Sequence, residues 1–192
     1  MSLDRVGIVV IGRNEGQRFA ACVQSLPGDV PTVYVDSGST DGSIDRARQH
    51  GVDVVELDPN SPFSMARARN VGFERVTQTN ADLEYVQFLD GDCTLCSGWL
   101  DRAVAWIESH SDVAVVSGRR HEQAPDASIY NRLCDIEWYT PVGEVRSCQG
   151  DALMRVGAFR EVGGFDESLI AGEEQELCVR FRQRGWIIQR ID

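Results

Sequence analysis

Two aspartates separated by one glycine, Asp90-Gly91-Asp92, follow directly after an apolar run rich in aromatic and β-branched residues, Tyr85–Leu89. That run predicts a strand, and open α/β sheets bind ligands at the carboxyl ends of their strands. Mg²⁺ and Mn²⁺ prefer oxygen ligands and are often held by one or two carboxylates together with substrate phosphates. The pair therefore indicates a metal–diphosphate site, or, because Asp and Gly are ordinary turn residues, only a turn.

The composition is that of a globular chain of one domain. Its 192 residues are enough to bury a core, and 42% of them are hydrophobic and 26% charged. Thirty acidic against nineteen basic residues give a net charge of −11, which argues against a nonspecific binder of nucleic acid or of anionic membranes. A metal ion and a few arginines can still make a local positive pocket for an anionic substrate.

No segment predicts a membrane span or a secretory signal. No apolar run approaches the ~20 residues that a bilayer requires, and the first apolar segment, Val6–Ile11, leads straight into charged residues. We therefore expect a cytoplasmic location, with membrane association only through regions outside this chain. The six cysteines are then expected as free thiols, although Cys93 and Cys96 form a Cys-x-x-Cys pair that leaves a redox dithiol open.

Strand-like and helix-like segments alternate as far as Ser117. This alternation predicts a largely parallel sheet with helices on both faces. The strands are expected at Val6–Ile11, Thr32–Val35, Val52–Leu57, Tyr85–Leu89 and Val113–Ser117, and the helices at Gln17–Leu26, Ser43–His50, Met65–Val76 and Trp99–Ser109.

The remainder of the chain is less regular. Residues 118–151 predict irregular structure, with Trp138-Tyr139-Thr140-Pro141 as a loop. A helix is expected at Glu173–Arg184, because Gly185 is a good helix stop, and a last strand at Trp186–Ile191. Because the chain stops within a strand, we expect it to be part of a longer protein.

The loops after the first two strands carry polar residues that can bind a nucleotide or a sugar. The first loop, Gly12-Arg13-Asn14-Glu15-Gly16, is neither Gly-x-Gly-x-x-Gly nor a Walker loop, which disfavours an oxidoreductase and a P-loop enzyme. Asn14 and Glu15 can hydrogen-bond a sugar or ribose hydroxyl, or can simply begin a helix. Asp36, at the end of the second strand, can accept from a base N–H or a ribose hydroxyl, or belong to an ordinary turn before a helix that Asp41 or Ser43 caps.

The order of these blocks resembles the inverting glycosyltransferases of family 2, which have the GT-A fold. The match spans essentially the whole chain, and the joint order of the blocks is more specific than any single block. The matching blocks are Ile8-Val9-Val10-Ile11 with Asn14-Glu15, Asp36–Ser43 with Ser37 in place of a second Asp, Ala66–Gly72, Asp90-Gly91-Asp92, Gly163–Glu167, Gly172–Leu177 and Arg184–Trp186.

The resemblance implies an α/β domain of GT-A (Rossmann-like) type, with a mostly parallel central sheet flanked by helices and a less regular C-terminal part on the acceptor side. Residues 1–192 would form a single domain, in which residues 1–117 bind the nucleotide sugar and residues 118–192 bind the acceptor. The implied reaction moves a sugar, with inversion, from a nucleoside-diphosphate sugar to an acceptor hydroxyl, with Mn²⁺ or Mg²⁺. A UDP-sugar is the expected donor by analogy, and a glycan or a lipid-linked molecule the expected acceptor.

The resemblance also implies a role for each matching residue. Asp90 and Asp92 would hold the metal, with Asp92 as the more direct ligand and Asp90 also near the ribose. The substrate-binding residues would be Asn14, Glu15, Asp36, Ser37, Arg67, Arg69, Asp90, Gly150 and Asp151. Either arginine would lie near the base or the phosphates, although each could also lie on a solvated helix face, and Gly150 and Asp151 would line the sugar and acceptor pocket.

Glu174 would be the general base and Glu173 its helper. Many members have Asp where this chain has Glu174, and the longer side chain leaves open which of the two glutamates acts. The acidic pair could also serve only to favour the helix dipole. Two rival functions remain: a sugar-phosphate nucleotidyltransferase, which would be expected to carry a glycine-rich first loop with a basic residue, and a non-catalytic module that binds a nucleotide or a sugar.

Overall fold

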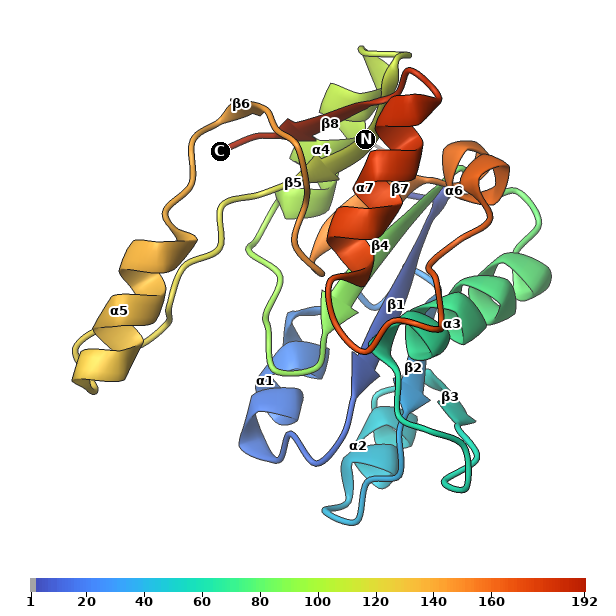
Figure 1. Ribbon diagram of the computed structural model, residues 1–192. Coiled ribbons are helices and arrows are strands. Elements are labelled where there is room, and N and C mark those ends of the chain that lie inside the picture. Colours follow the sequence, from blue (N-terminus) through green and yellow to red (C-terminus); the bar gives the residue numbers. More distant parts are fainter. Residues whose placement is uncertain (1–2) are drawn as a thin grey trace.

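The computed structural model describes residues 3–192, which form one eight-stranded sheet flanked by helices (Figure 1). The strands lie in the order β3-β2-β1-β4-β7-β5-β8-β6. In chain order the elements are β1 (Val6–Gly12), α1 (Gln17–Ser25), β2 (Thr32–Asp36), α2 (Ser43–Gln49), β3 (Asp53–Glu56), α3 (Met65–Thr79), β4 (Tyr85–Asp90), α4 (Trp99–Glu108), β5 (Val113–Ser117), α5 (Ile129–Trp138), β6 (Gly143–Glu144), β7 (Ala152–Arg155), α6 (Val156–Val162), α7 (Glu173–Gln183) and β8 (Ile187–Arg190). The α/β class expected from the sequence is confirmed.

The sheet is mostly parallel. Strands β3, β2, β1 and β4 run parallel to one another, as do β5 and β8. Strand β7 runs antiparallel between β4 and β5, and β6 runs antiparallel to β8. Because parallel strands are joined by crossover helices, the carboxyl ends of β1, β2 and β4 come together at one edge of the sheet.

The strands are apolar on both faces, because helices cover both. In β1, Val9 and Ile11 belong to one core cluster and Ile8 and Val10 to the other, as the two-residue period of a strand requires. The first face is covered by α3, α6 and α7 and the second by α1, α2 and α4 (Figure 1). Their main contacts are Phe73, Phe159 and Phe181 on the first face and Phe19, Ala47 and Leu100 on the second.

Helix α5 lies in the segment that the sequence predicted to be irregular, so that prediction is wrong for residues 129–138, including Trp138. The helix begins where the Ser128 hydroxyl accepts a hydrogen bond from the amide of Asn131. Its apolar residues recur at helical spacing, but the helix projects away from the sheet (Figure 1) and buries none of its residues. The local signals for a helix are therefore present, while the burial that usually accompanies them is absent.

Strand β7 was also not predicted, and it has a consequence for the site. It pairs with β4 in the register Phe88↔Ala152, so the residues just before β7 lie next to the end of β4. Gly150 and Asp151 are those residues. A long-range strand pairing thus brings the second half of the chain to the rim formed by the first.

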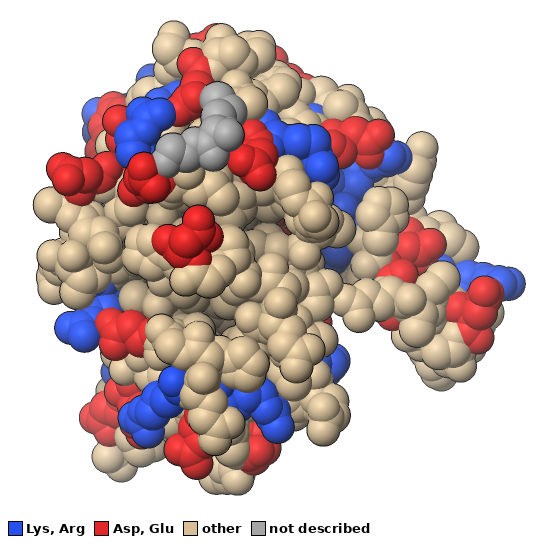
Figure 2. All heavy atoms as spheres, turned by 180° about the vertical axis from the view of Figure 1, so that it is seen from behind, with Lys and Arg blue, Asp and Glu red and all other residues tan. Residues whose placement is uncertain are grey.

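Two surface properties complete the description. Within residues 3–192, no helix is both long and apolar enough to cross a bilayer. On the face of the molecule shown in Figure 2, acidic and basic side chains are interspersed and are not gathered into one basic surface.

Candidate active site

The carboxyl ends of β2, β1 and β4 form one rim, and Asp36 and Asp90 lie on either side of β1. In the sheet register Gly12 is opposite Asp36, and Ile11 is opposite Asp90. Open α/β sheets bind ligands outside such carboxyl ends. The loops that leave these strands therefore form the candidate site.

Asp36 holds the turn that follows β2. Its carboxylate accepts hydrogen bonds from the Tyr34 hydroxyl at 2.8 Å and from the backbone amides of Gly38 and Ser39 at 2.8 and 2.7 Å. Burial, together with the neighbouring Asp36 carboxylate, raises the pKa of Tyr34, so the phenol remains a hydrogen-bond donor. Asp36 is 1% exposed. The carboxylate of Asp36 is therefore enclosed within the turn that it fixes, and Ser37 in that turn is half-buried.

Asn14 joins the loop after β1 to the loop after β2. Its side-chain oxygen accepts a hydrogen bond from the backbone amide of Thr40 at 2.7 Å, and its backbone amide donates one to the Ser39 hydroxyl at 2.9 Å. Nearby, the amide of Gly16 donates to the carboxylate of Asp41 at 2.8 Å. Asn14 has a left-handed backbone, with φ of 58°, a conformation that asparagine tolerates better than most residues. The two loops are thus locked into a single polar surface.

Asp92 is the most exposed of the predicted carboxylates at the rim. Its side chain is 42% exposed, and its Oδ2 lies 3.7 Å from Nη1 of Arg18. Arg18 also pairs with Glu15 at 2.9 Å. A Cβ atom on Gly91 would lie 3.6 Å from Cγ of Glu15. Glu15, Arg18 and Asp92 therefore line the same part of the rim.

Asp90 lies between two arginines. Its Oδ1 is 2.9 Å from Nη2 of Arg69, and its Oδ2 is 3.6 Å from Nη2 of Arg120. Burial and then the negative charge of Asp151 raise the pKa of Asp90 to about 6, while the two arginines act to lower it. Its backbone amide donates to Oδ1 of Asp151 at 2.9 Å. Asp90 is thus fixed at both its backbone and its side chain.

Gly150 and Asp151 close the rim from the side of β7. The carboxylate of Asp151 also pairs with Arg120. A Cβ atom on Gly150 would lie 2.5 Å from Nη2 of Arg69 and 3.0 Å from Oδ2 of Asp90. A side chain at this position would displace these groups, so only glycine permits so close an approach of the backbone.

Helix α3 places its two predicted arginines in different surroundings. Arg69 is 1% exposed, whereas Arg67 is half-buried. Hydrogen bonds from Asn60 lower the pKa of Asp58, and the charge of Arg67 adds to that effect, which places Arg67 near the loop before α3. Residues two positions apart on a helix point in different directions, and that separates the two arginines.

Helix α7 brings Glu173 and Glu174 to Arg69. The helix begins after Gly172, whose φ is 84°, and an acidic first turn is favoured by the helix dipole. Oε1 of Glu173 lies 2.7 Å from Nη1 of Arg69, and Oε1 of Glu174 lies 3.2 Å from the same nitrogen. The Glu173 side chain is 1% exposed and that of Glu174 is 13% exposed. Of the two glutamates, Glu174 is the more open to a ligand.

These contacts form one charged group, which we call the Arg69 cluster. It combines four carboxylates with two guanidiniums and so carries two excess negative charges when all are ionised. Its buried atoms without a hydrogen-bond partner are Nε of Arg69, Nε of Arg120 and Oε2 of Glu173. The members are Arg69, Asp90, Arg120, Asp151, Glu173 and Glu174.

Two residues at the rim were not predicted from the sequence, Arg18 and Arg120. Arg120 follows the end of β5 by a few residues, so it belongs to the same type of strand-end loop as Asp36 and Asp90. That position was the available signal. Arg180 and Arg182 lie in the last turn of α7, where Arg180 pairs with Glu176.

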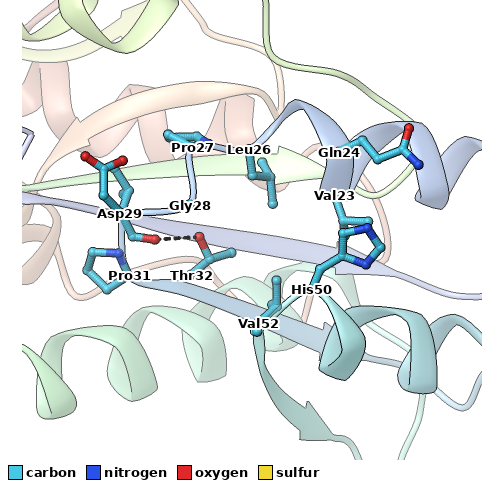
Figure 3. A pocket seen from close by; sticks show the side chains of 12 residues that line it. Val23, Gln24, Leu26, Pro27, Gly28, Asp29, Pro31, Thr32, His50 and Val52 are labelled. Carbon is cyan, nitrogen blue, oxygen red and sulfur yellow. Dashed lines mark hydrogen bonds between the residues drawn. The ribbon is translucent and has the colours of Figure 1, made fainter.

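The cavity in Figure 3 lies at the other end of the sheet. It has a volume of about 600 Å³ and includes Thr32, the first residue of β2, whereas the predicted site lies beyond Asp36, the last. Its lining side chains include Leu26, Pro27 and His50 (Figure 3) and none of the predicted site residues. This cavity is separate from the rim.

The fold of this chain is similar to that of known structures. A mannosyltransferase from Pyrobaculum calidifontis in complex with GDP-Man and Mn²⁺ superposes with a TM-score of 0.71 at 20% identity, over 97% of this chain and 54% of that one. The S. aureus protein TarS (residues 1–349) in complex with UDP superposes with a TM-score of 0.70 at 20% identity, over 97% and 57%. These likenesses show that the fold is of GT-A type.

The sequence comparisons identify the family. A pre-mycofactocin glycosyltransferase of Mycobacterium tuberculosis is 29% identical over 94% of this chain, which spans 39% of the length of that relative. The profile described as Glycosyl transferase family 2 matches residues 7–161. The resemblance seen in the strand-end motifs is confirmed, and the chain belongs to glycosyl transferase family 2.

Proposed function

We propose that this chain transfers a sugar from a nucleoside-diphosphate sugar to an acceptor hydroxyl, with inversion at the anomeric carbon. The observation that carries the proposal is the position of Glu174, a partly exposed carboxylate in the same charged cluster as Asp90 at the carboxyl end of β4. A base and a site for the donor diphosphate are thereby adjacent. The neighbours that bind UDP, or GDP-Man with Mn²⁺, support such a donor.

Glu174 is the base in this proposal. In an inverting displacement the acceptor hydroxyl attacks from the side opposite the leaving diphosphate, and a carboxylate takes its proton. The base must reach the acceptor oxygen, which favours Glu174 over the enclosed Glu173. Glu173 then serves to hold Arg69, which its Oε1 contacts at 2.7 Å.

The nucleoside binds to the loops after β1 and β2 in this proposal, at the surface formed by Asn14, Glu15 and the turn of Asp36 and Ser37. The hydrogen bonds between these loops hold that surface in place before a ligand binds. Arg67 is half-buried at the start of α3 and is better placed than the enclosed Arg69 to meet phosphates. We propose UDP as the nucleotide of the donor sugar, by analogy with the family.

The charges at the rim fit a divalent cation that binds together with the diphosphate. Residues 3–192 contain no group of three or more His, Cys, Asp or Glu side chains that could hold a metal ion alone. The Arg69 cluster has excess negative charge, and Asp92 adds an exposed carboxylate. One or two carboxylates completed by phosphate oxygens and water are a usual site for Mg²⁺. Asp92, with Asp90 beside it, would hold Mn²⁺ or Mg²⁺, and the cation would neutralise charge on the departing diphosphate.

The two halves of the chain then have different tasks. Residues 1–117 contribute the loops for the nucleotide sugar, and residues 118–192 contribute Gly150, Asp151 and the glutamates of α7. The acceptor approaches Glu174 from the second half. We propose that it is a hydroxyl of a glycan or of a lipid-linked molecule.

The test measures release of nucleoside diphosphate from a panel of UDP- and GDP-sugars with Mn²⁺, with water or added sugars as acceptor. We expect Glu174→Gln to lower kcat by about 10²- to 10⁴-fold, the usual contribution of a general base. The matched control is Glu176→Gln, because Glu176 lies on the same helix and pairs with Arg180 outside the cluster. Wild-type rates in Glu174→Gln would contradict the assignment, and NMR that shows retained anomeric configuration would contradict inversion.

A further inference from the structure

Arg69 contacts the proposed base and the donor-side aspartate at the same time. Nη2 lies 2.9 Å from Asp90, and Nη1 lies 2.7 Å from Glu173 and 3.2 Å from Glu174. Asp90 ends β4, the two glutamates begin α7, and the arginine lies in the first half of α3. One guanidinium therefore joins the consecutive elements α3 and β4 to α7, whose Glu173 lies 104 residues further along the chain.

The side chain of Arg69 is enclosed by neighbouring groups. Its guanidinium carbon lies 5.5 Å from the centroid of the Phe165 ring, and a Cβ atom on Gly150 would lie 2.5 Å from Nη2. Burial alone would lower the pKa of Arg69, but the surrounding carboxylates raise it above its usual value, so the group stays charged. The side chain is 1% exposed and so presents almost no surface to a nucleotide.

We propose that Arg69 is a positioning residue that sets the place of the Glu174 carboxylate relative to Asp90, and that it does not bind the nucleotide. This inference rests on the proposed role of Glu174 as the base. A guanidinium presents donors in a rigid planar fork, so it can hold carboxylates on different sides at once. A lysine at this position would carry the same charge on a single nitrogen and could not span both sides.

Arg69→Lys separates positioning from nucleotide binding. We expect the affinities for UDP and GDP with Mn²⁺, and the KM for the donor sugar, to change far less than kcat, because Asp92, the more direct metal ligand, pairs with Arg18 and not with Arg69. The kcat should fall by about 10²-fold, the scale of a misplaced catalytic group. The matched control is Arg75→Lys, because Arg75 lies on the same helix and pairs with Asp53 at the surface.

A double variant tests whether Arg69 acts through Glu174. With Glu174→Gln already in place, Arg69→Lys should cause little further loss of kcat, because the base that it positions is absent. An equal loss in both backgrounds would show that Arg69 acts independently and would overturn the proposal. Unchanged kcat in folded Arg69→Lys, or a loss confined to nucleotide affinity, would overturn it as well.

Crystal structures of the wild type and of Arg69→Lys test the proposal without an activity measurement. We expect the Glu174 carboxylate to move relative to Asp90 while the sheet and α7 keep their places. An unmoved Glu174 would overturn the positioning role. If the wild type releases no nucleoside diphosphate, the proposed function is wrong. The two structures still show whether Arg69 sets the position of Glu174.

Folding needs a control of its own, because Arg69 balances a buried charge. Removal of one partner of a buried ion pair leaves the other uncompensated. If Arg69→Lys does not fold, Arg69→Met combined with Glu173→Gln removes both charges of the most enclosed pair. This variant should also lower kcat far more than it changes nucleotide affinity, and wild-type kcat in it would overturn the proposal.

Discussion

The backbone amide of Asp90 donates a hydrogen bond of 2.9 Å to the carboxylate of Asp151. Asp90 is the last residue of β4, and Asp151 immediately precedes β7, the strand that runs antiparallel to β4. Asp151 therefore satisfies an amide at the point where the proposed donor half and acceptor half of the chain meet. The same carboxylate pairs with Arg120, which extends the Arg69 cluster.

This relationship predicts different effects for two substitutions of Asp151. Asp151→Ala leaves the Asp90 amide without its partner and leaves Arg120 only the more distant carboxylate of Asp90, and we expect a loss of about 1–3 kcal/mol in the free energy of unfolding. Asp151→Asn keeps an oxygen that can accept from the amide, so its loss should be smaller. Urea unfolding measures both, and an Asn variant as unstable as the Ala variant would contradict the role of that hydrogen bond.

Gly72 in α3 is predicted to be required for packing. A Cβ atom there would lie 2.3 Å from Cγ1 of Val9 in β1, so Gly72→Ala forces the helix away from the sheet and should cost about 1–3 kcal/mol. The matched control is Gly157→Ala in α6, where a Cβ atom meets nothing within 4 Å. That variant should gain about 0.5–1 kcal/mol from helix propensity. Thermal unfolding measures both changes. Unfolding temperatures that shift in the same direction in the two variants would contradict this prediction.

Asp41 should make the stability depend on pH in the acid range. Hydrogen bonds, foremost the one from the Ser43 hydroxyl, lower the pKa of its carboxyl below the usual 3.8. Because the pKa is lower in the folded state, the stabilisation is fully present above the usual pKa and is lost as the pH falls through the lower, folded-state value. Asp41→Asn should remove this part of the acid dependence.

The measurement for Asp41 is urea unfolding at a series of pH values from neutral to below the usual pKa of the carboxyl. Ser43→Ala, which removes the hydroxyl donor, should weaken the dependence without abolishing it, because the amides of Gly16 and Ser43 still donate to Asp41. Identical pH profiles for the wild type and for Asp41→Asn would refute the assignment.

The first half of the fold could be predicted because its signals are local. Val9 and Ile11 alternate with Ile8 and Val10 along β1, and the helix between β1 and β2 carries its buried residues at helical spacing. Helix α5 has equally local signals, but it buries none of its residues, and Ile129, Tyr130, Leu133 and Ile136 stay exposed, so the usual apolar face of a core helix is missing. Strand β7 depends on a pairing with the distant β4, which four residues of sequence do not reveal.

The site could be predicted only in part, for similar physical reasons. Asp36 and Asp90 end the parallel strands β2 and β4, which lie on either side of β1, and the topology alone brings such residues to one rim. The directions of Arg67 and Arg69 depend on how α3 rotates against the sheet, which the sequence does not specify. The position of Arg120 just after β5 is a local signal, but its contacts with Asp90 and Asp151 are long-range ion pairs, which leave no local pattern.

The most direct test of a metal-dependent donor site is calorimetry of UDP and GDP binding, with Mn²⁺ and with EDTA. It should be performed on the wild type, on Asp92→Asn, and on Asp29→Asn, a control beside the cavity at the opposite end of the sheet (Figure 3). We predict that one nucleotide binds the wild type and the control only with Mn²⁺, and that Asp92→Asn weakens this binding by about tenfold or more, as the loss of one charged ligand should. If the wild type binds as tightly in EDTA as with Mn²⁺ and Asp92→Asn binds as tightly as the wild type, the proposed metal-dependent donor site is contradicted. No binding of either nucleotide by the folded wild type would contradict it as well.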